Sequence, residues 1–297
     1  MIEPLRIRAV NTAADSENKI HDDCIAAQYG FRGGLVPGVT VYGYLAAAVL
    51  DHFGDTWLKS GAIDVRFHQP IYEDDEAIVT LARDHENPGR VRVTVGVNGA
   101  ECASAVAWLQ ETREINSALD AIDHPPSPPP HPTQAPVRRT PTVETLAPGT
   151  VLASLLQPLD LAQSRISAPL DPAVVVAGNA SVRFAHPAVL LALANEIFVK
   201  NYELGPWIHS SSEVRKFSAA RDGELIYTSA VVEDRFERKG HEFVVLDVVI
   251  AARIGNAAGI GLASGDVTPA RADLRIDDFR IVERIRHTAI WRPRVSV

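Results

Sequence analysis

Residues 36–67 read VPGVTVYGYLAAAVLDHFGDTWLKSGAIDVRF, and this stretch decides the expected fold. The part from 39 to about 53 predicts a helix that is apolar on almost every side, so it must be buried nearly all round. Residues 63–67 then alternate between apolar and polar, which is the period of a strand with one buried face. A long buried helix followed by a strand is therefore the expected building unit.

The same order of features returns in the second half of the chain. An apolar stretch from 188 to about 201 predicts a second helix, and a strand-like run, EVRKF, follows at 213–217. Trp57 and Trp207 are 150 residues apart, and the two helix starts are 149 apart. An offset held this steadily indicates an internal duplication.

Long strands follow the helix in each half. Residues 90–97 alternate, and the alternation resumes at 101–109 after Asn98-Gly99. Asn-Gly is a strong hairpin signal because both turn positions need positive φ. The β-branched run 243–250 is the counterpart in the second half. A curved sheet wrapped round each helix would bury it, so the expected fold class is α+β.

A proline-rich segment divides the two repeats. Seven of the twelve residues at 125–136, PPSPPPHPTQAP, are proline, which lacks a backbone donor and favours an extended chain. We expect an N-terminal domain at 1–122, a linker at 123–142 and a C-terminal domain at 143–297. The alternative for the proline segment is a ligand for a proline-reading partner domain.

The composition is that of an ordinary globular protein. Of the 297 residues, 46% are hydrophobic and 22% charged, and 29 Lys and Arg against 37 Asp and Glu give a net charge of −8. Without an excess of cations, neither nucleic acid nor an anionic membrane is expected as a partner. No apolar run reaches the ~20 residues needed to span a bilayer. Two cysteines and no signal-peptide pattern favour a cytoplasmic location.

The chemistry-bearing side chains gather at 15–45, DSENKIHDDCIAAQYGFRGGLVPGVTVYGYL. Asp15, Glu17 and His21 form an acid–base cluster, because histidine titrates near neutrality and a nearby carboxylate can fix its tautomer. Asp22 is expected to cap a short helix that follows it. The cluster therefore indicates general acid–base chemistry.

Two glycine-containing segments follow the cluster. The loop GFRGG at 30–34 lets backbone approach a ligand or a neighbouring element. Gly38 begins the first buried helix, where its N–H and the helix dipole can stabilise negative charge on a carbonyl oxygen. Acid, base and oxyanion donor in one loop system indicate protonation or hydration next to a carbonyl.

The spacing of these residues resembles the MaoC-like (R)-specific enoyl-CoA hydratases and dehydratases. The matching residues are Asn18, Ile20, His21, Asp23, Gly30, Phe31, Leu35 and Gly38. The order of helices and strands extends the resemblance, more weakly, to most of the chain. It implies a double hot-dog fold, in which two long helices are each wrapped by an antiparallel sheet and fused as a pseudo-dimer.

The resemblance also implies a function. It implies a lyase that hydrates 2-enoyl thioesters, or dehydrates 3-hydroxyacyl thioesters, carried on CoA or on acyl-carrier protein. The implied catalytic residues are Asp15, His21 and, as oxyanion donor, Gly38; the implied substrate-binding residues are Asn18, Gly30, Phe31, Tyr42 and His186. No metal or redox cofactor is expected, because the thioester carbonyl is the electron sink. Pseudo-dimers are expected to be able to assemble further.

Three positions depart from the family pattern. Ser16 stands at the position of the family's Asp, so that Asp15 or Glu17 would have to replace it, and Lys19 and Pro37 stand at the positions of a Pro and a His. Two alternatives therefore stay open beside the hydratase. One is a hot-dog thioesterase, in which an activated water attacks the carbonyl. The other is an acyl-thioester-binding subunit without catalysis.

The second half contains no comparable cluster. Leu170 stands near the place of a second histidine, and we expect this half to be non-catalytic. His186 precedes the second helix, where it would either contact substrate or cap that helix.

Overall fold

The computed structural model describes residues 3–122, 137–164, 170–171, 173–175, 183–253 and 278–294. Residues 123–136, most of the expected linker, lie outside the described residues. The domain boundaries expected from the sequence therefore stay predictions.

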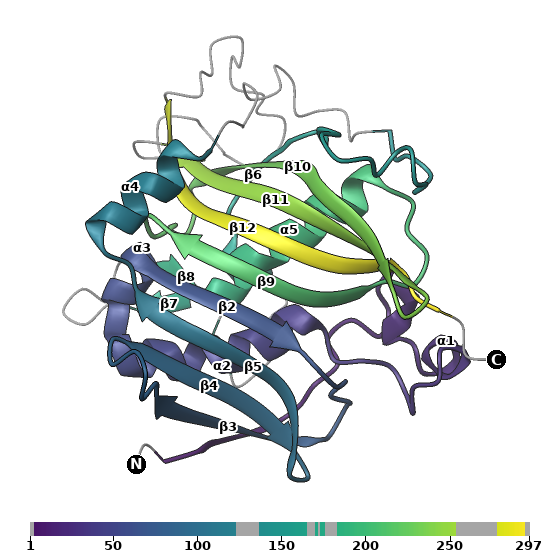
Figure 1. The fold of residues 1–297 in the computed structure, drawn as a ribbon, viewed down its shortest axis with the longest axis horizontal. Helices are drawn as coiled ribbons and strands as arrows, with labels where there is room; N and C mark the ends of the chain where they lie inside the picture. Colours follow the sequence, from purple (N-terminus) through teal and green to yellow (C-terminus); the bar gives the residue numbers. More distant parts are fainter. Residues whose placement is uncertain are drawn as a thin grey trace.

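In the part of the chain that the structure describes, ten strands form one curved antiparallel sheet (Figure 1). The N-terminal half supplies five neighbouring strands, in the order β1 (Leu5–Arg8), β3 (Glu76–Arg83), β4 (Arg90–Val97), β5 (Ala100–Leu109) and β2 (Gly61–Phe67). The C-terminal half continues the sheet with β9 (Ile208–Lys216), β12 (Phe279–Arg292), β11 (His241–Arg253), β10 (Leu225–Arg238) and β6 (Leu155–Pro158). A separate two-stranded sheet pairs β7 (Ala173–Val175) with β8 (Arg183–Ala185).

The two halves of the large sheet meet where β2 pairs with β9. Asp64 lies opposite Glu213 in this pair, and these residues are 149 positions apart, which is within one residue of the offset between the repeats. Equivalent residues of the two repeats thus face one another at the centre of the sheet. The halves are accordingly related by an approximate two-fold axis at this point.

Two long helices, α2 (Gly38–Phe53) and α5 (Pro187–Asn201), lie side by side on one face of the sheet (Figure 1). Both were predicted from the sequence. Gly43 lets them approach closely, since a Cβ at that position would lie 3.2 Å from the Cβ of Ala188. The core is continuous across the two halves and includes Leu45 of α2 and Leu191 of α5.

The other helices among the described residues are short. They are α1 (Asp23–Gln28), α3 (Trp57–Ser60) and α4 (Thr112–Asp120), with 3-10 turns η1 (Lys19–His21), η2 (Gly54–Thr56) and η3 (Leu161–Gln163). Two local predictions are confirmed: Asp22 caps α1 by accepting a 2.9 Å hydrogen bond from the Ile25 N–H, and Asn98 and Gly99 turn with φ of 51° and 81°. No described helix is both long enough and apolar enough to cross a membrane.

Candidate active site

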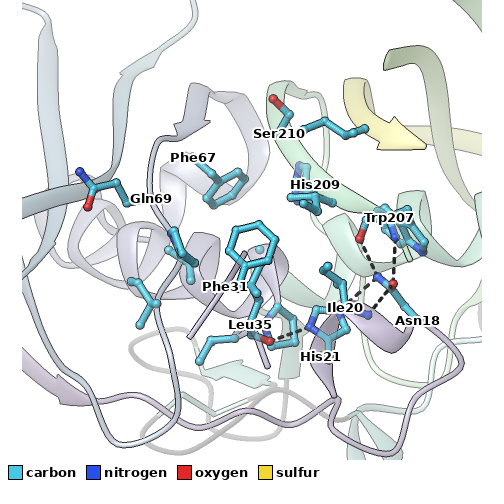
Figure 2. Close-up of a pocket in the computed structure, with 18 of the residues that line it drawn as sticks. Asn18, Ile20, His21, Phe31, Leu35, Phe67, Gln69, Trp207, His209 and Ser210 are labelled. Carbon is cyan, nitrogen blue, oxygen red and sulfur yellow. Dashed lines mark hydrogen bonds between the residues drawn. The ribbon is translucent and has the colours of Figure 1, made fainter. Parts of the chain in front are cut away.

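A pocket of about 230 Å³ lies at the N-terminus of α2, where β9 of the other half begins. Figure 2 shows His21 and Asn18 on one side of it and His209 and Ser210 on another. Both halves line the pocket, with His21, Phe31, Gly38 and Phe67 from the first and Asn195, Trp207, His209 and Ser210 from the second. The site is therefore shared between the two repeats.

His21 ends the 3-10 turn η1 and presents one ring nitrogen as a base. Its Nδ1 lies 2.6 Å from the backbone oxygen of Leu35. A carbonyl oxygen only accepts hydrogen bonds, so Nδ1 carries the proton and Nε2 keeps a lone pair. Burial lowers the pKa of His21 below its usual value, although the hydrogen bond to Leu35 raises it. The ring is thus neutral at pH 7, with Nε2 able to accept a proton.

Asn18 ties the His21 turn to the C-terminal half. Its Nδ2 donates to the carbonyl oxygen of Trp207 at 3.0 Å and lies 3.3 Å from Nε2 of His21. Its Oδ1 accepts from the Trp207 N–H at 3.1 Å. These contacts also fix which way the amide faces, since the N–H of Trp207 needs an acceptor and its carbonyl a donor. Asn18 therefore anchors the loop that carries His21 to the C-terminal half.

The glycine-rich loop closes beneath His21. Gly34 donates its N–H to Oδ1 of Asp23 at 2.7 Å, and a Cβ at Gly34 would lie 2.1 Å from the backbone oxygen of His21. A side chain at this position would therefore displace the histidine. Two roles were expected for this loop, close approach to a ligand or close approach to a neighbouring element. Its described contacts are of the second kind.

Gly38 offers a hydrogen-bond donor to the pocket. It is the first residue of α2, so its N–H has no acceptor within the helix. None of the described residues accepts a hydrogen bond from it elsewhere. The positive end of the helix dipole adds to the same effect. The position suits a ligand oxygen on which negative charge develops.

Within the described part of the chain, no carboxylate forms a hydrogen bond or ion pair with His21. Asp15 is exposed and does not line the pocket. Glu17 forms an ion pair with Arg138 at 3.1 Å. Among the described residues, none of those lining the pocket is Asp, Glu, Lys or Arg. The polar side chains there are amides, imidazoles, the Trp207 indole and the hydroxyl of Ser210.

The other residues expected to bind substrate fall in different places. Phe31 lines the pocket, but Gly30, Tyr42 and His186 do not. Tyr42 is fully buried in α2. His186 was expected either to contact substrate or to cap the second helix. It caps α5, because its Nδ1 accepts the Ala188 N–H at 3.2 Å.

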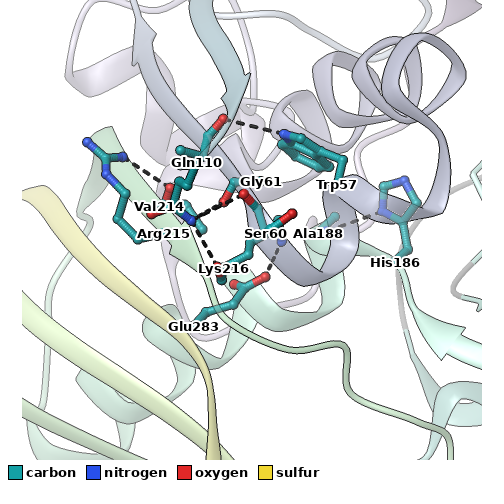
Figure 3. Close-up of polar contacts among 11 residues, drawn as sticks. Trp57, Ser60, Gly61, Gln110, His186, Ala188, Val214, Arg215, Lys216 and Glu283 are labelled. Carbon is teal, nitrogen blue, oxygen red and sulfur yellow. Dashed lines mark hydrogen bonds and ion pairs between the residues drawn. The ribbon is translucent and has the colours of Figure 1, made fainter. Parts of the chain in front are cut away.

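The position related to the pocket by the approximate two-fold axis is filled. Because β2 and β9 are antiparallel, this position lies between the N-terminus of α5, the end of β9 and the start of β2. Lys216 and Glu283 form an ion pair there, with each side chain only 1% exposed (Figure 3). Gln110 donates to the backbone oxygens of Lys216 and Gly61, both at 2.9 Å. These side chains occupy the second site.

The pocket residues of the C-terminal half could not be assigned from the sequence. Trp207 was visible as a landmark of the repeat, but its place beside Asn18 was not. His209 and Asn195 follow no pattern that marks a site. Their location depends on the pairing of β2 with β9, and edge-to-edge pairing of two repeats leaves no mark in the spacing of residues.

The fold is similar to that of several solved structures. A conserved hypothetical protein from Mycobacterium tuberculosis with a double hot-dog fold matches with a TM-score of 0.53 and 13% identity, over 97% of this chain and 95% of that one. A protein described as a MaoC domain dehydratase from Chloroflexus aurantiacus gives 0.54 and 12%, over 98% and 95%. A MaoC-like dehydratase gives 0.51 and 14%, over 96% of each chain.

Sequence comparison adds nothing to this likeness. No protein-family model matches the chain, and no curated protein matches it. The structural likeness extends over nearly the whole chain and includes both repeats. The chain therefore has the double hot-dog fold, which MaoC-like dehydratases share.

Proposed function

We propose that this protein hydrates 2-enoyl thioesters, and dehydrates (R)-3-hydroxyacyl thioesters, in the pocket at the N-terminus of α2. The observation that carries the proposal is the pairing of two groups in one pocket. Nε2 of His21 is the unprotonated ring nitrogen and can take a proton once its long, 3.3 Å hydrogen bond from the Asn18 amide gives way to water, and the N–H of Gly38 is free to bind a carbonyl oxygen. Hydration of a double bond conjugated to a carbonyl needs both groups.

The reaction can proceed with His21 as the only base. The thioester oxygen accepts a hydrogen bond from Gly38, which draws electrons from the double bond toward the carbonyl. A water gives one proton to Nε2 of His21 while its oxygen bonds to C3. His21 then returns that proton to C2 on the same face, which restores the thioester and the neutral imidazole. Dehydration is the same sequence reversed.

The surroundings of His21 support this role. The Leu35 carbonyl holds the proton on Nδ1 and, by accepting the N–H, stabilises the imidazolium that forms in mid-reaction. Phe31, Phe67 and Ile71 give the pocket apolar walls that suit an acyl chain. The names of two proteins of like fold, both described as MaoC-type dehydratases, agree with this class of reaction.

One observation favours a second candidate, a subunit that binds acyl thioesters without turning them over. No carboxylate lines the pocket among the described residues, so the acid–base pair implied by the resemblance is incomplete there. A positioned acid or base contributes about 10²–10⁴-fold in rate. The one-base route is accordingly expected to be slower than a route with a complete pair.

Analysis of the products distinguishes hydration, thioester hydrolysis and binding without turnover. The purified protein is incubated with crotonyl-CoA and with a longer trans-2-enoyl-CoA, and loss of the enoyl absorbance is followed beside release of free thiol. Loss of absorbance without thiol, with an (R)-3-hydroxyacyl product, supports the proposal. Thiol release indicates a thioesterase. Binding of both substrates without either signal would establish the binding subunit instead.

A further inference from the structure

A groove of about 500 Å³ lies beside the pocket. The groove and the pocket share Phe67, His68 and Ser210 as walls, and Figure 2 labels two of these, Phe67 and Ser210. His241, at the start of β11, lines the pocket, and its ring lies edge-on to that of Phe243 in the groove, with centroids 6.5 Å apart. A ligand too long for the pocket can therefore continue into the groove.

Short hydroxyl side chains and one arginine form a row across the groove. Arg66 of β2 is exposed, whereas its neighbour Val65 belongs to the core, so the groove opens on the outer face of the sheet. Arg66 pairs with Ser211 of β9, and Ser211 pairs with Thr288 of β12. Cross-strand partners lie on the same face of a sheet. Ser210 is an extra residue of β9 without a partner on β12, and this bulge bends the strand between groove and pocket.

Two carboxylates also line the groove, and each already has an arginine partner. Asp64 accepts a 2.6 Å hydrogen bond from Arg215, and Glu213 forms an ion pair with Arg286 at 3.5 Å. Asp64 and Glu213 lie opposite one another, two residues further from the pocket along β2 than Arg66. They therefore leave the part of the groove nearest the pocket without a carboxylate.

Two arginines of the groove stay available to a ligand. Arg66 and Arg238 both line it and are exposed. Neither forms an ion pair or a hydrogen bond with any other residue that the structure describes. Arg238 lies on β10 opposite His241, at the hairpin that reaches the pocket. Guanidinium groups beside serine and threonine hydroxyls are the donors that phosphate groups take.

An aromatic pair forms another wall of the groove. Phe236 and Phe243 face one another across β10 and β11. Their rings are stacked, with centroids 4.7 Å apart and an angle of 8° between the planes. Phe236 is still 37% exposed. Exposed aromatic side chains pack well against the bases of nucleotides, so the groove offers partners for both a base and its phosphates.

We propose that the groove binds the nucleotide end of coenzyme A. Arg66 and Arg238 contact its phosphate groups, and Phe236 packs against its adenine. The pantetheine arm then passes the shared wall of the two hollows and carries the thioester into the pocket. The inference rests on the proposed function for the thioester itself, and it goes further by naming CoA as the carrier.

A carrier protein would use these features less fully. Its phosphopantetheine arm ends in one phosphate joined to a serine of the protein, and it has no adenine. One phosphate would serve only one of Arg66 and Arg238, and Phe236 would have no base to contact. The charge and the aromatic wall of the groove therefore fit CoA better than a carrier protein.

Calorimetry with the full chain tests the contribution of the nucleotide. It compares butyryl-CoA with butyryl-pantetheine, which has the same thioester but lacks the nucleotide. We expect the wild type to bind butyryl-CoA at least about tenfold more tightly, since a hydrogen bond to a charged group is worth that much. Adenosine 3′,5′-bisphosphate should compete with butyryl-CoA. Equal affinities for the two thioesters would overturn the inference.

Substitutions of the two arginines test where the nucleotide binds. Arg66→Gln and Arg238→Gln should each weaken butyryl-CoA about tenfold and leave butyryl-pantetheine within twofold. Arg66→Lys keeps the cation and should keep most of the affinity. Arg83→Gln is the matched control, because Arg83 is an exposed arginine of β3 that does not line the groove. Unchanged binding of butyryl-CoA in both groove variants would overturn the assignment.

The aromatic wall is tested in the same way. Phe236→Ala should weaken butyryl-CoA at least about fivefold, which is the lower end of the effect of losing a base–aromatic contact. Its affinity for butyryl-pantetheine should not change. An equal loss for both thioesters would show that Phe236 supports the pocket rather than the nucleotide, which contradicts the inference.

These outcomes are separate from the fate of the proposed reaction. A nucleotide preference that depends on Arg66 and Arg238, in a protein that hydrates nothing, would keep the inference and reject the reaction. Hydration of enoyl-CoA and enoyl-pantetheine with equal kcat/KM would keep the reaction and reject the inference. If the two arginine variants weaken a butyryl-carrier protein but not butyryl-CoA, the carrier is a protein and the inference is wrong.

Discussion

The side-chain amide of Asn18 binds both backbone polar groups of Trp207, a residue 189 positions later in the chain. The same amide lies 3.3 Å from Nε2 of His21. One side chain thus sets the position of the candidate base and joins the two repeats at the pocket. The site and the interface between the halves therefore depend on each other.

Replacing Asn18 tests this coupling. Asn18→Ala leaves the N–H and the carbonyl of Trp207 without their partners, so we expect the free energy of unfolding to fall by about 1–3 kcal/mol. Asn18→Asp keeps an acceptor for the N–H but places a negative charge beside His21. The pKa of His21 should then rise. Urea unfolding and an NMR titration of His21 measure the two effects, and an unchanged stability in Asn18→Ala would count against the coupling.

Gly38→Ala tests the close approach of α2 to His209. The added methyl group would lie 2.9 Å from Nδ1 of His209, so the ring has to move away from the start of the helix. We expect kcat to fall by at least tenfold while the unfolding free energy falls by about 1–3 kcal/mol. Gly89→Ala is the control, since nothing lies within 4 Å of a Cβ there. Equal activity in the two variants would contradict the arrangement.

A double-mutant cycle tests whether Lys216 and Glu283 stabilise the position opposite the pocket only as a pair. Lys216→Met leaves the Glu283 carboxyl buried without its cation, where burial already raises its pKa. We expect a loss of about 3–5 kcal/mol. Adding Glu283→Gln should recover much of it, because no charge is then buried. Urea midpoints of the four proteins give the coupling, and additive losses would refute it.

The pH dependence of stability should report on His186. Burial lowers its pKa from 6.5 to about 4, with Lys216 contributing. The unfolded chain therefore binds the proton first as the pH falls, so stability is complete above about pH 6.5 and declines toward pH 4. At pH 5 the loss from this residue is about 2 kcal/mol relative to pH 7. His186→Gln should remove that part of the decline in urea unfolding, and an unchanged decline would contradict the assigned pKa.

Local patterns in the sequence predicted the elements that carry strong periodicity. The two helices of the repeat are confirmed at Gly38–Phe53 and Pro187–Asn201, because a nearly all-apolar helix has few alternatives to burial. The turn at Asn98-Gly99 and the Asp22 cap are also confirmed, because each is determined by a few neighbouring residues in the sequence. The α+β class could be predicted because a long apolar helix followed by strands occurs in both halves, whereas the double hot-dog fold was implied by the resemblance to the MaoC-like hydratases.

The site was harder to predict because half of it is non-local. His21 and Gly38 stand in a recognisable segment and do line the pocket. The position of Asp15 depends on the course of a loop that has no periodicity, and the structure leaves it exposed. His209 reaches the pocket through a bulge and through pairing between repeats. Neither the bulge nor the pairing between the repeats can be recognised from a single sequence.

The most direct test of the account compares wild type with His21→Gln in one assay of enoyl-CoA hydration, together with calorimetric binding of butyryl-CoA. We expect the wild type to consume the enoyl absorbance without releasing thiol. His21→Gln should lose at least about 10²-fold in kcat while its affinity for butyryl-CoA stays within a few-fold. Equal rates in the two proteins, or a wild type that binds butyryl-CoA but never consumes the enoyl substrate, would contradict the account.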